Sequence, residues 1–512
     1  MKAAAILATL VLAALQCGSA PAEQADSATF RSYQRARAVL QRAIDAHGGL
    51  ERIRAIENAS GEYDGLRTMI NQSPRPEGPW DKQPASGRFI IDRRGDRLYM
   101  VTSTAYAGIG AFSGAWAITG TEGIHWEPPK NHYGSEIIAK MSGASDTDGT
   151  WANVIRWVPS FLLLSAWDNS TNLRWIGAYE KNGRNYEAIG FVERNRRNLV
   201  VIIDAGSFLL DGFETIRDDG VYGDITDFTR FSDYVDIAGV KFPTRRTEYQ
   251  NGEVARELTL KFTVNTTLDE SLFKLPAGYS LPSVASVAAP RIRRIGDGVY
   301  VDTEMGGVMI IEFKDFLVAL DCPDDFRTSQ STIDAVKQVI PDKPFKYVIP
   351  SHTHGDHGGG VRAYYYAGTT LLTTPGNRDF YQKLATIKQT ILPDPLSLQP
   401  RQPVIETFKA KRVITDGTQI LEIHDLGPNP HTEEMTFAYL PKQKIVWQSD
   451  LLFTPQTGGG LNKAMPIGIQ FAKKLRQLGI TDFKQLVESH HSRTITLDEF
   501  KASLAKAGYD EF

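Results

Sequence analysis

The sequence predicts two domains: an antiparallel β-sheet domain with flanking helices, followed by a layered α/β domain. Strand-like segments separated by Gly-containing turns fill most of residues 23–280, whereas strands and helices alternate over residues 293–512. Between them, "SLPSVASVAAP" is uncharged and contains prolines, so residues 281–292 are predicted to be a linker. A chain of 512 residues is long enough for two such domains.

The composition is that of a globular protein. Apolar residues make up 42% of the chain and charged residues 23%, and the formal net charge is −3. This charge argues against a general nucleic-acid or anionic-membrane binder, because such proteins need a clear excess of Lys and Arg. No segment after the N-terminal apolar run approaches the length of a transmembrane helix. A small molecule is therefore the expected partner.

The N-terminus has the pattern of an export signal. Lys2 precedes the apolar run "AAAILATLVLAAL", and "APA" ends at Ala22, which predicts a signal peptide over residues 1–22. Cleavage would release the protein into the periplasm or outside the cell. A lipoprotein anchored at Cys17 is the alternative, although Gln16 stands where a lipid-attachment box has a small residue.

The first domain begins with a helix and continues as hairpins. "FRSYQRARAVLQRAIDAHGG" has helical periodicity and ends in two glycines, which favour a helix C-terminus. Turns divide "GRFIIDRRGDRLYMV", "YEKNGRNYEAIGFVE" and "EYQNGEVARELTLKF" into paired strands, and two of these turns contain Asn-Gly. "WANVIRWVPSFLLLSAW", residues 151–167, predicts a core helix rich in Trp and Leu.

The second domain alternates buried strands with helices. "GVMIIEFKDFLVALD" predicts two strands, "QSTIDAVKQVI" a helix and "KYVIP" a third strand. "GGGVRAYYYA" and "TTLLTTP" add a short helix and another strand. This order is typical of an α/β domain whose sheets are covered by helices.

A cluster of possible metal ligands follows the strand "FKYVIP". The segment "SHTHGDHGGG" places His352, His354, Asp356 and His357 within six positions, where α/β proteins often carry their sites. Neutral imidazole and carboxylate groups are ligands that Zn²⁺ prefers. A polar loop with accidental histidines is the alternative, but the chain has only ten histidines in 512 residues. The cluster therefore predicts a metal site.

This H-x-H-x-D-H spacing after a strand resembles the signature of the metallo-β-lactamase superfamily. The resemblance extends over roughly residues 295–500 and implies an αββα sandwich for residues 293–512. It also implies a metal-site role for Asp321, which would brace the metal loop, and for His431, Asp450 and His490. The last ligand stays open between His490 and His491, because Ser489 and His491 replace the family's glycines there.

The resemblance implies a centre of two zinc ions, with iron and manganese as alternatives. His352, His354 and His431 would hold one ion, Asp356, His357 and His490 the second, and Asp450 would bridge both. Two ions about 3.5–4 Å apart lower the pKa of a shared water, whose hydroxide would be the nucleophile. Asp356 and Asp450 are the catalytic candidates, since either could orient this hydroxide and accept a proton.

The predicted function is that of an exported, dinuclear, zinc-dependent hydrolase that cleaves an ester, a lactone or a β-lactam-type amide. Two alternatives remain at this stage. One is a non-enzymatic binding or carrier protein with a structural metal site, and the other is an iron-dependent redox relative of the same fold. His424 lies on a predicted strand, and we interpret it as a core histidine.

The first domain resembles periplasmic lipoprotein-carrier (outer-membrane lipoprotein-sorting) domains. "AIDAHGGLERIRAIENASGEYDG" is similar to their opening segment, and "DYVDIAGVKFPTRRTEYQNGE" and "NTTLDESLFKLPAGY" to their closing strands. The resemblance implies a curved antiparallel sheet whose concave face could hold an acyl or lipid ligand. A scaffold that only packs on the catalytic domain is the alternative.

Overall fold

The computed structural model describes residues 27–128, 137–169, 172–279, 290–304, 308–453, 461–490 and 493–512. The predicted signal peptide, most of the predicted linker, and His491 lie outside these described residues. The protein is of mixed α/β type with large antiparallel sheets. Among the described helices, none is both long and apolar enough to cross a membrane.

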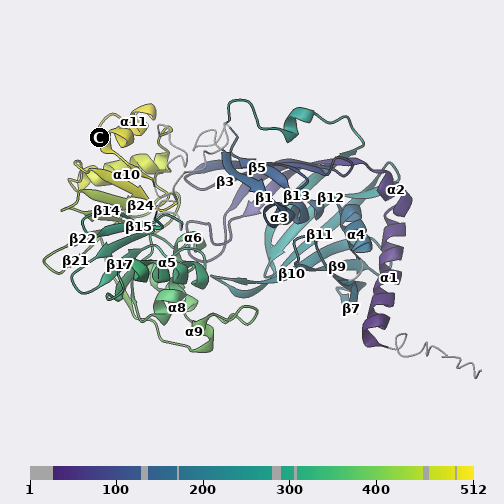
Figure 1. Cartoon of the computed structure of the whole chain (residues 1–512), viewed down its shortest axis with the longest axis horizontal. Coiled ribbons are helices and arrows are strands. Elements are labelled where there is room, and N and C mark those ends of the chain that lie inside the picture. The colour runs from purple at the N-terminus through teal and green to yellow at the C-terminus, as the bar shows by residue number, and fades with distance from the viewer. Residues whose placement is uncertain are drawn as a thin grey trace, which may run out of the picture.

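A thirteen-stranded antiparallel sheet dominates the first half of the described chain (Figure 1). Its order is β6-β5-β4-β3-β2-β1-β13-β12-β11-β10-β9-β8-β7, two meanders that meet where β1 pairs with β13. Its strands are β1 (Asn58–Thr68), β2 (Lys82–Asp92), β3 (Arg97–Tyr106), β4 (Gly110–Thr119), β5 (Glu122–Trp126), β6 (Ile137–Ser142), β7 (Arg174–Lys181), β8 (Arg184–Val192), β9 (Asn198–Asp204), β10 (Leu210–Asp219), β11 (Gly223–Ile237), β12 (Val240–Gln250) and β13 (Glu253–Val264).

The two Asn-Gly turns form as the sequence predicts. Asn182 and Gly183 between β7 and β8 have φ angles of 54° and 74°, and Asn251 and Gly252 between β12 and β13 have 50° and 88°. Both central residues of a type I′ turn need positive φ, which Asn and Gly adopt at the least cost. These turns therefore fix the register of two of the three predicted hairpins.

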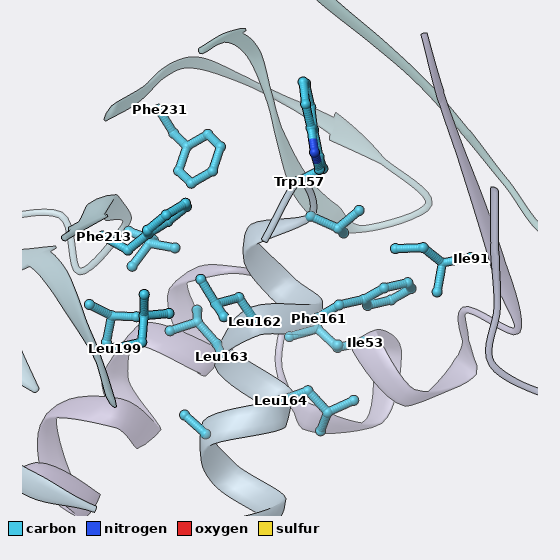
Figure 2. Packing of buried hydrophobic residues seen from close by; sticks show 14 of the residues in the cluster. Ile53, Ile91, Trp157, Phe161, Leu162, Leu163, Leu164, Leu199, Phe213 and Phe231 are labelled. Atoms are coloured by element: carbon cyan, nitrogen blue, oxygen red, sulfur yellow. The ribbon is translucent and has the colours of Figure 1, made fainter. Parts of the chain in front are cut away.

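Four helices pack with the large sheet around one apolar core: α1 (Ala28–Ala46), α2 (Leu50–Ala55), α3 (Ala144–Ile155) and α4 (Pro159–Asp168). Figure 2 shows Phe161 and Leu163 of α4 among side chains from the sheet, including Ile91 and Leu199. The prediction of one helix over residues 151–167 is wrong in one respect. The helix breaks before Pro159, which has no backbone N–H to donate and starts α4 instead.

The second half contains a seven-stranded and a six-stranded sheet. The first consists of β14 (Ile292–Gly296), β15 (Val299–Asp302), β16 (Met309–Glu312), β17 (Leu317–Leu320), β18 (Phe345–Ile349), β19 (Thr370–Thr373) and β20 (Ile405–Thr407). The second consists of β21 (Lys411–Thr415), β22 (Ile420–Asp425), β23 (Thr436–Leu440), β24 (Ile445–Gln448), β25 (Gln485–Glu488) and β26 (Thr494–Ile495). The strand pairs β17–β18, β18–β19 and β19–β20 are parallel, as is β24–β25.

These two sheets share one apolar core. Side chains from both sheets, such as Val318 and Trp447, belong to the same buried cluster. On the outer side of each sheet, helices pack against that sheet and form a separate buried cluster with its side chains. The helices are α5 (Phe326–Val339), α6 (Gly355–Gly358), α7 (Val361–Tyr366), α8 (Arg378–Leu384), α9 (Pro395–Leu398), α10 (Pro466–Gln477) and α11 (Leu497–Lys506), with 3-10 turns η3 (Glu270–Phe273) and η4 (Pro375–Asn377). The strands and helices predicted between residues 306 and 375 are confirmed.

The first half packs directly on the second. Ile109 of the first half belongs to the buried cluster around α10 and α11, and Val221 to the cluster around α5 and α7. Asp218 also forms an ion pair with Arg327 at 2.6 Å. Loops of the large sheet therefore reach the region around α6, which carries part of the predicted metal loop (Figure 1).

Candidate metal centre

The metal loop turns sharply from β18 into α6 and α7. His354 is the residue before α6, and the glycines that follow are packed too closely for a side chain. A Cβ on Gly359 would lie 2.2 Å from the carbonyl oxygen of Asp324, and one on Gly360 would lie 2.1 Å from Ser329 Oγ. The glycine run therefore lets the loop pack against the N-terminus of α5, which holds the preceding histidines in place.

His352, His354, His431 and Asp450 form a first group of possible ligands, all buried, whose ligand atoms lie within 4.8 Å of one another. His352 Nε2 lies 3.0 Å from His354 Nδ1, and His431 Nε2 lies 2.9 Å from Asp450 Oδ2. His352 Nε2 lies 3.5 Å from the same carboxylate oxygen. Three ring nitrogens and one carboxylate therefore face a common point.

Asp356, His357 and His490 form a second group within the same 4.8 Å limit. Asp450 lies between the two groups. Its Oδ1 lies 2.5 Å from His490 Nε2, and its Oδ2 lies 3.3 Å from His357 Nε2. Asp450 has a φ of 57°, a conformation that costs energy in a residue other than glycine and that often occurs at functional sites.

The other ring nitrogen of each buried histidine in the two ligand groups has its own partner. Ser351 Oγ lies 3.0 Å from His352 Nδ1, and Asp321 Oδ2 lies 2.9 Å from His357 Nδ1. Asp321 thus contacts a histidine of the metal loop, where the resemblance implied a bracing residue. Outer partners of this kind fix the tautomer and the ring orientation of metal-binding histidines.

Two outer partners come from the first half of the chain, which the sequence did not predict. His354 Nε2 lies 3.0 Å from the carbonyl oxygen of Ser73, and His431 Nδ1 lies 3.3 Å from that of Ala107. Gln72 Nε2 also donates a hydrogen bond to Asp356 Oδ1 at 3.1 Å. Backbone carbonyls occur at every residue, so no sequence pattern could have identified Ser73 or Ala107.

Burial and neighbouring charge shift the pKa values of several residues in the two groups in different directions. Burial holds the pKa of His352 well below its usual value and lowers that of His354 to about 3, so both rings are neutral. Burial also lowers the pKa of His490, but the Asp450 carboxylate outweighs it and raises this pKa to about 9. Although burial raises the pKa of Asp450, His357 and His490 hold it well below its usual range. A protonated His490 ring thus lies beside the Asp450 carboxylate, at a position where a bound cation could balance the same negative charge.

Ser449 and Ser489 both lie beside His357. Ser449 Oγ lies 3.0 Å from His357 Nδ1, and Ser489 Oγ donates a hydrogen bond to Ser449 Oγ at 2.8 Å. Of the two candidates for the last ligand, His490 is part of the second group, whereas His491 is outside the described residues.

A cavity of about 710 Å³ opens at the ligand groups and is lined by both halves of the chain. Asp356, His431, Asp450 and His490 belong to its lining, and the first half supplies much of the rest. The volume is in the range of pockets that bind small molecules. His424, interpreted above as a core histidine, is buried on β22 against Phe437 and belongs to neither ligand group.

Comparisons with known proteins give structural likenesses only. No family model matches the sequence, and no curated protein matches it. A metallo-β-lactamase from Pontibacter korlensis is similar over 42% of this chain and 98% of its own, with 19% identity and a TM-score of 0.33. The metallo-β-lactamase FIM-1 from Pseudomonas aeruginosa, in a mono-zinc form, is similar over 42% of this chain and 94% of its own, with 20% identity and a TM-score of 0.31.

A flavodiiron protein from Giardia intestinalis is also similar. It matches 44% of this chain and 60% of its own, with 16% identity and a TM-score of 0.32. These solved structures are metallo-β-lactamase-fold proteins, and they include a mono-zinc form and a flavodiiron protein. They give no support to the lipoprotein-carrier resemblance of the first half.

Proposed function

We propose that this protein is a hydrolase that depends on two metal ions, most simply zinc, and that it cleaves an ester, a lactone or an amide. The observation that carries the proposal is Asp450, which lies between two adjoining ligand groups and contacts rings of both. A structural zinc site is closed and needs four ligands. Seven ligands in two groups that open onto a cavity favour catalysis over a purely structural role.

The donor atoms fit zinc. Imidazole nitrogens and carboxylate oxygens are its usual ligands, and the first group offers three imidazoles with one shared carboxylate. His354 would bind through Nδ1 and His431 through Nε2, because their other nitrogens are held by Ser73 and Ala107. When bound, two zinc ions would supply Lewis acidity that activates water and polarises the scissile carbonyl.

The two aspartates differ in what they can do for the reaction. The Asp450 side chain is 5% exposed and contacts four histidines, so it serves to join and orient the two groups. The Asp356 side chain is 41% exposed and faces the cavity, so it can exchange a proton with substrate or solvent. Gln72 donates to Oδ1 of Asp356, and Oδ2 lies 3.6 Å from His357 Nε2, within the second ligand group. We therefore assign proton transfer to Asp356 and positioning to Asp450.

A hydrolysis screen tests the proposed function. The zinc-loaded protein is assayed against matched chromogenic esters, lactones, β-lactams, phosphodiesters and sulfate esters, with Asp450→Ala as the comparison variant. We expect turnover of at least one acyl substrate and a loss of about 100-fold or more in Asp450→Ala. Turnover that is equal in the variant, or confined to phosphodiesters, would contradict the proposal.

A further inference from the structure

A second cavity adjoins the cavity of the metal centre. It measures about 580 Å³ and lies against the large sheet, between the strands and helix α3. Arg67, Ile70 and Gln250 line both cavities, so these residues mark the junction. A substrate that extends from the ligand groups into the second cavity would lie beside Arg67.

The lining of the second cavity is polar and positively charged. Four arginines and two acidic residues line it, together with threonines from several strands and the rings of Trp116 and Trp157. A cavity built only for an acyl chain would have aliphatic walls, because a buried hydrocarbon gains nothing from hydroxyl or guanidinium groups. This lining suits a ligand with polar groups and a negative charge.

Arg67 differs from the other arginines that line the two cavities. Arg217 pairs with Asp219 and Asp227. The remaining three also have carboxylate partners, namely Arg156 with Glu193, and Arg246 and Arg256 with Glu248. Within the described part of the chain, Arg67 has no ion pair.

The position of Arg67 is nevertheless well defined. Its guanidinium donates a hydrogen bond to the hydroxyl of Tyr106 at 2.9 Å and lies 5.4 Å from the centre of that ring. On the neighbouring strand, Arg256 is directly opposite Arg67. Like charges directly opposite each other destabilise a sheet, so a bound anion would relieve this pair.

All but one of the acidic residues that line the metal-site cavity already have an ion-pair partner or belong to the ligand groups. Asp218 and Asp325 pair with Arg327, and Asp219 pairs with Arg217. Asp356 and Asp450 belong to the ligand groups. Asp324 is the remaining acidic residue of this wall, and no ion pair involves it among the described residues.

We propose that Arg67 recognises a carboxylate on the substrate, so that the substrates of this metal centre are elongated acyl compounds with a negative charge remote from the scissile bond. The inference rests on the proposed hydrolase function. The planar guanidinium of arginine matches a carboxylate in a two-point contact, which a lysine does not reproduce. The carboxylate of the substrate would then bind Arg67 at the junction of the two cavities while its acyl bond lies at the ligand groups.

Matched chromogenic esters test this inference. The substrates are 4-nitrophenyl esters with acyl chains of six, eight and ten carbons that end in either a methyl group or a carboxylate. For at least one length, we expect kcat/KM of the zinc-loaded protein to favour the carboxylate ester. Arg67→Ala should lower the ratio of carboxylate to methyl ester about tenfold or more, the effect of losing a charged hydrogen bond. Arg67→Gln serves as the second variant if Arg67→Ala folds poorly, and the zinc content of each is measured.

Arg88 provides a matched control. It donates to the Tyr99 hydroxyl at 3.3 Å and lies 5.3 Å from that ring, as Arg67 does with Tyr106, but it lines neither cavity. Arg88→Ala should keep the wild-type ratio. A wild-type preference for the methyl esters, or a carboxylate preference that survives loss of Arg67, would overturn the inference.

Failure of the proposed function would give a different result. If the wild-type protein hydrolyses none of these esters, the hydrolase proposal fails for acyl esters, and calorimetric titration with suberate then tests Arg67 alone. Suberate binding that weakens about tenfold in Arg67→Ala supports recognition of a carboxylate. Equal suberate affinity in wild type and variant overturns it.

Discussion

His354 Nε2 lies 3.0 Å from the carbonyl oxygen of Ser73, which is 281 positions earlier in the chain. His431 has a similar contact with Ala107. Both histidines belong to the first ligand group, and both outer partners belong to loops of the large sheet. The first half of the protein therefore takes part in building the metal centre and is more than a separate scaffold.

Gln72→Leu should weaken metal binding at the second group. The substitution removes the hydrogen bond from Gln72 to Asp356 Oδ1 while keeping a similar volume. Loss of an outer partner of a metal ligand typically costs 10- to 100-fold in affinity or activity, and we expect about tenfold. Competition with a zinc chelator measures the change. Gln83→Leu on β2, which lines neither cavity, is the control, and equal affinity in both variants would refute the role of Gln72.

His490→Ala should lose or weaken one metal ion, whereas His491→Ala should keep both. His490 lies 2.5 Å from Asp450 and belongs to the second ligand group. His490 already belongs to this group, so we expect it to supply the last ligand nitrogen. Metal content per chain measured by mass spectrometry distinguishes the variants. The reverse pattern would move the assignment by one residue.

His47 should make the protein less stable in mild acid. Burial lowers its pKa from 6.5 to about 4, and its Nε2 has no hydrogen-bond partner among the described residues. Below about pH 6.5 the unfolded chain binds a proton that the folded protein does not, so stability falls as the pH drops toward 4. The full effect is about 3 kcal/mol. Urea unfolding of wild type and His47→Gln at several pH values should show a flatter profile for the variant, and parallel profiles would contradict this assignment.

Export remains a prediction from the first 22 residues. The mature protein should begin at Glu23, because "APA" ends at Ala22. Intact mass of the protein recovered from the cell envelope or the medium decides this. A chain that begins at Cys17 and carries acyl mass would show a lipoprotein instead.

Much of the fold could be predicted from local sequence. The Asn-Gly turns and the alternation of apolar residues predicted the hairpins, since turn geometry and strand periodicity depend on neighbouring residues. The break at Pro159 was missed because the apolar residues on both sides suggested one continuous helix. Pairing of β1 with β13 joins segments some 200 positions apart, and no local pattern contains that information.

The sequence pointed to the candidate ligands themselves, but not to the groups of the first half that contact them. Spacing alone drew attention to His352, His354, Asp356 and His357, and the resemblance added His431, Asp450 and His490, all of which the structure brings together. The contributions of Gln72, Ser73 and Ala107 depend on how the large sheet packs on the metal loop. Such contacts arise from tertiary structure, and no local sequence pattern identifies them.

Metal analysis of the protein purified from its native cells tests the central claim most directly. The two adjoining ligand groups that share Asp450 predict two zinc ions per chain and no visible absorption band. Zinc content that falls in Asp450→Ala would tie both ions to this site. Iron in place of zinc, with an absorption band in the visible range, would contradict the zinc hydrolase and favour redox chemistry at the same residues.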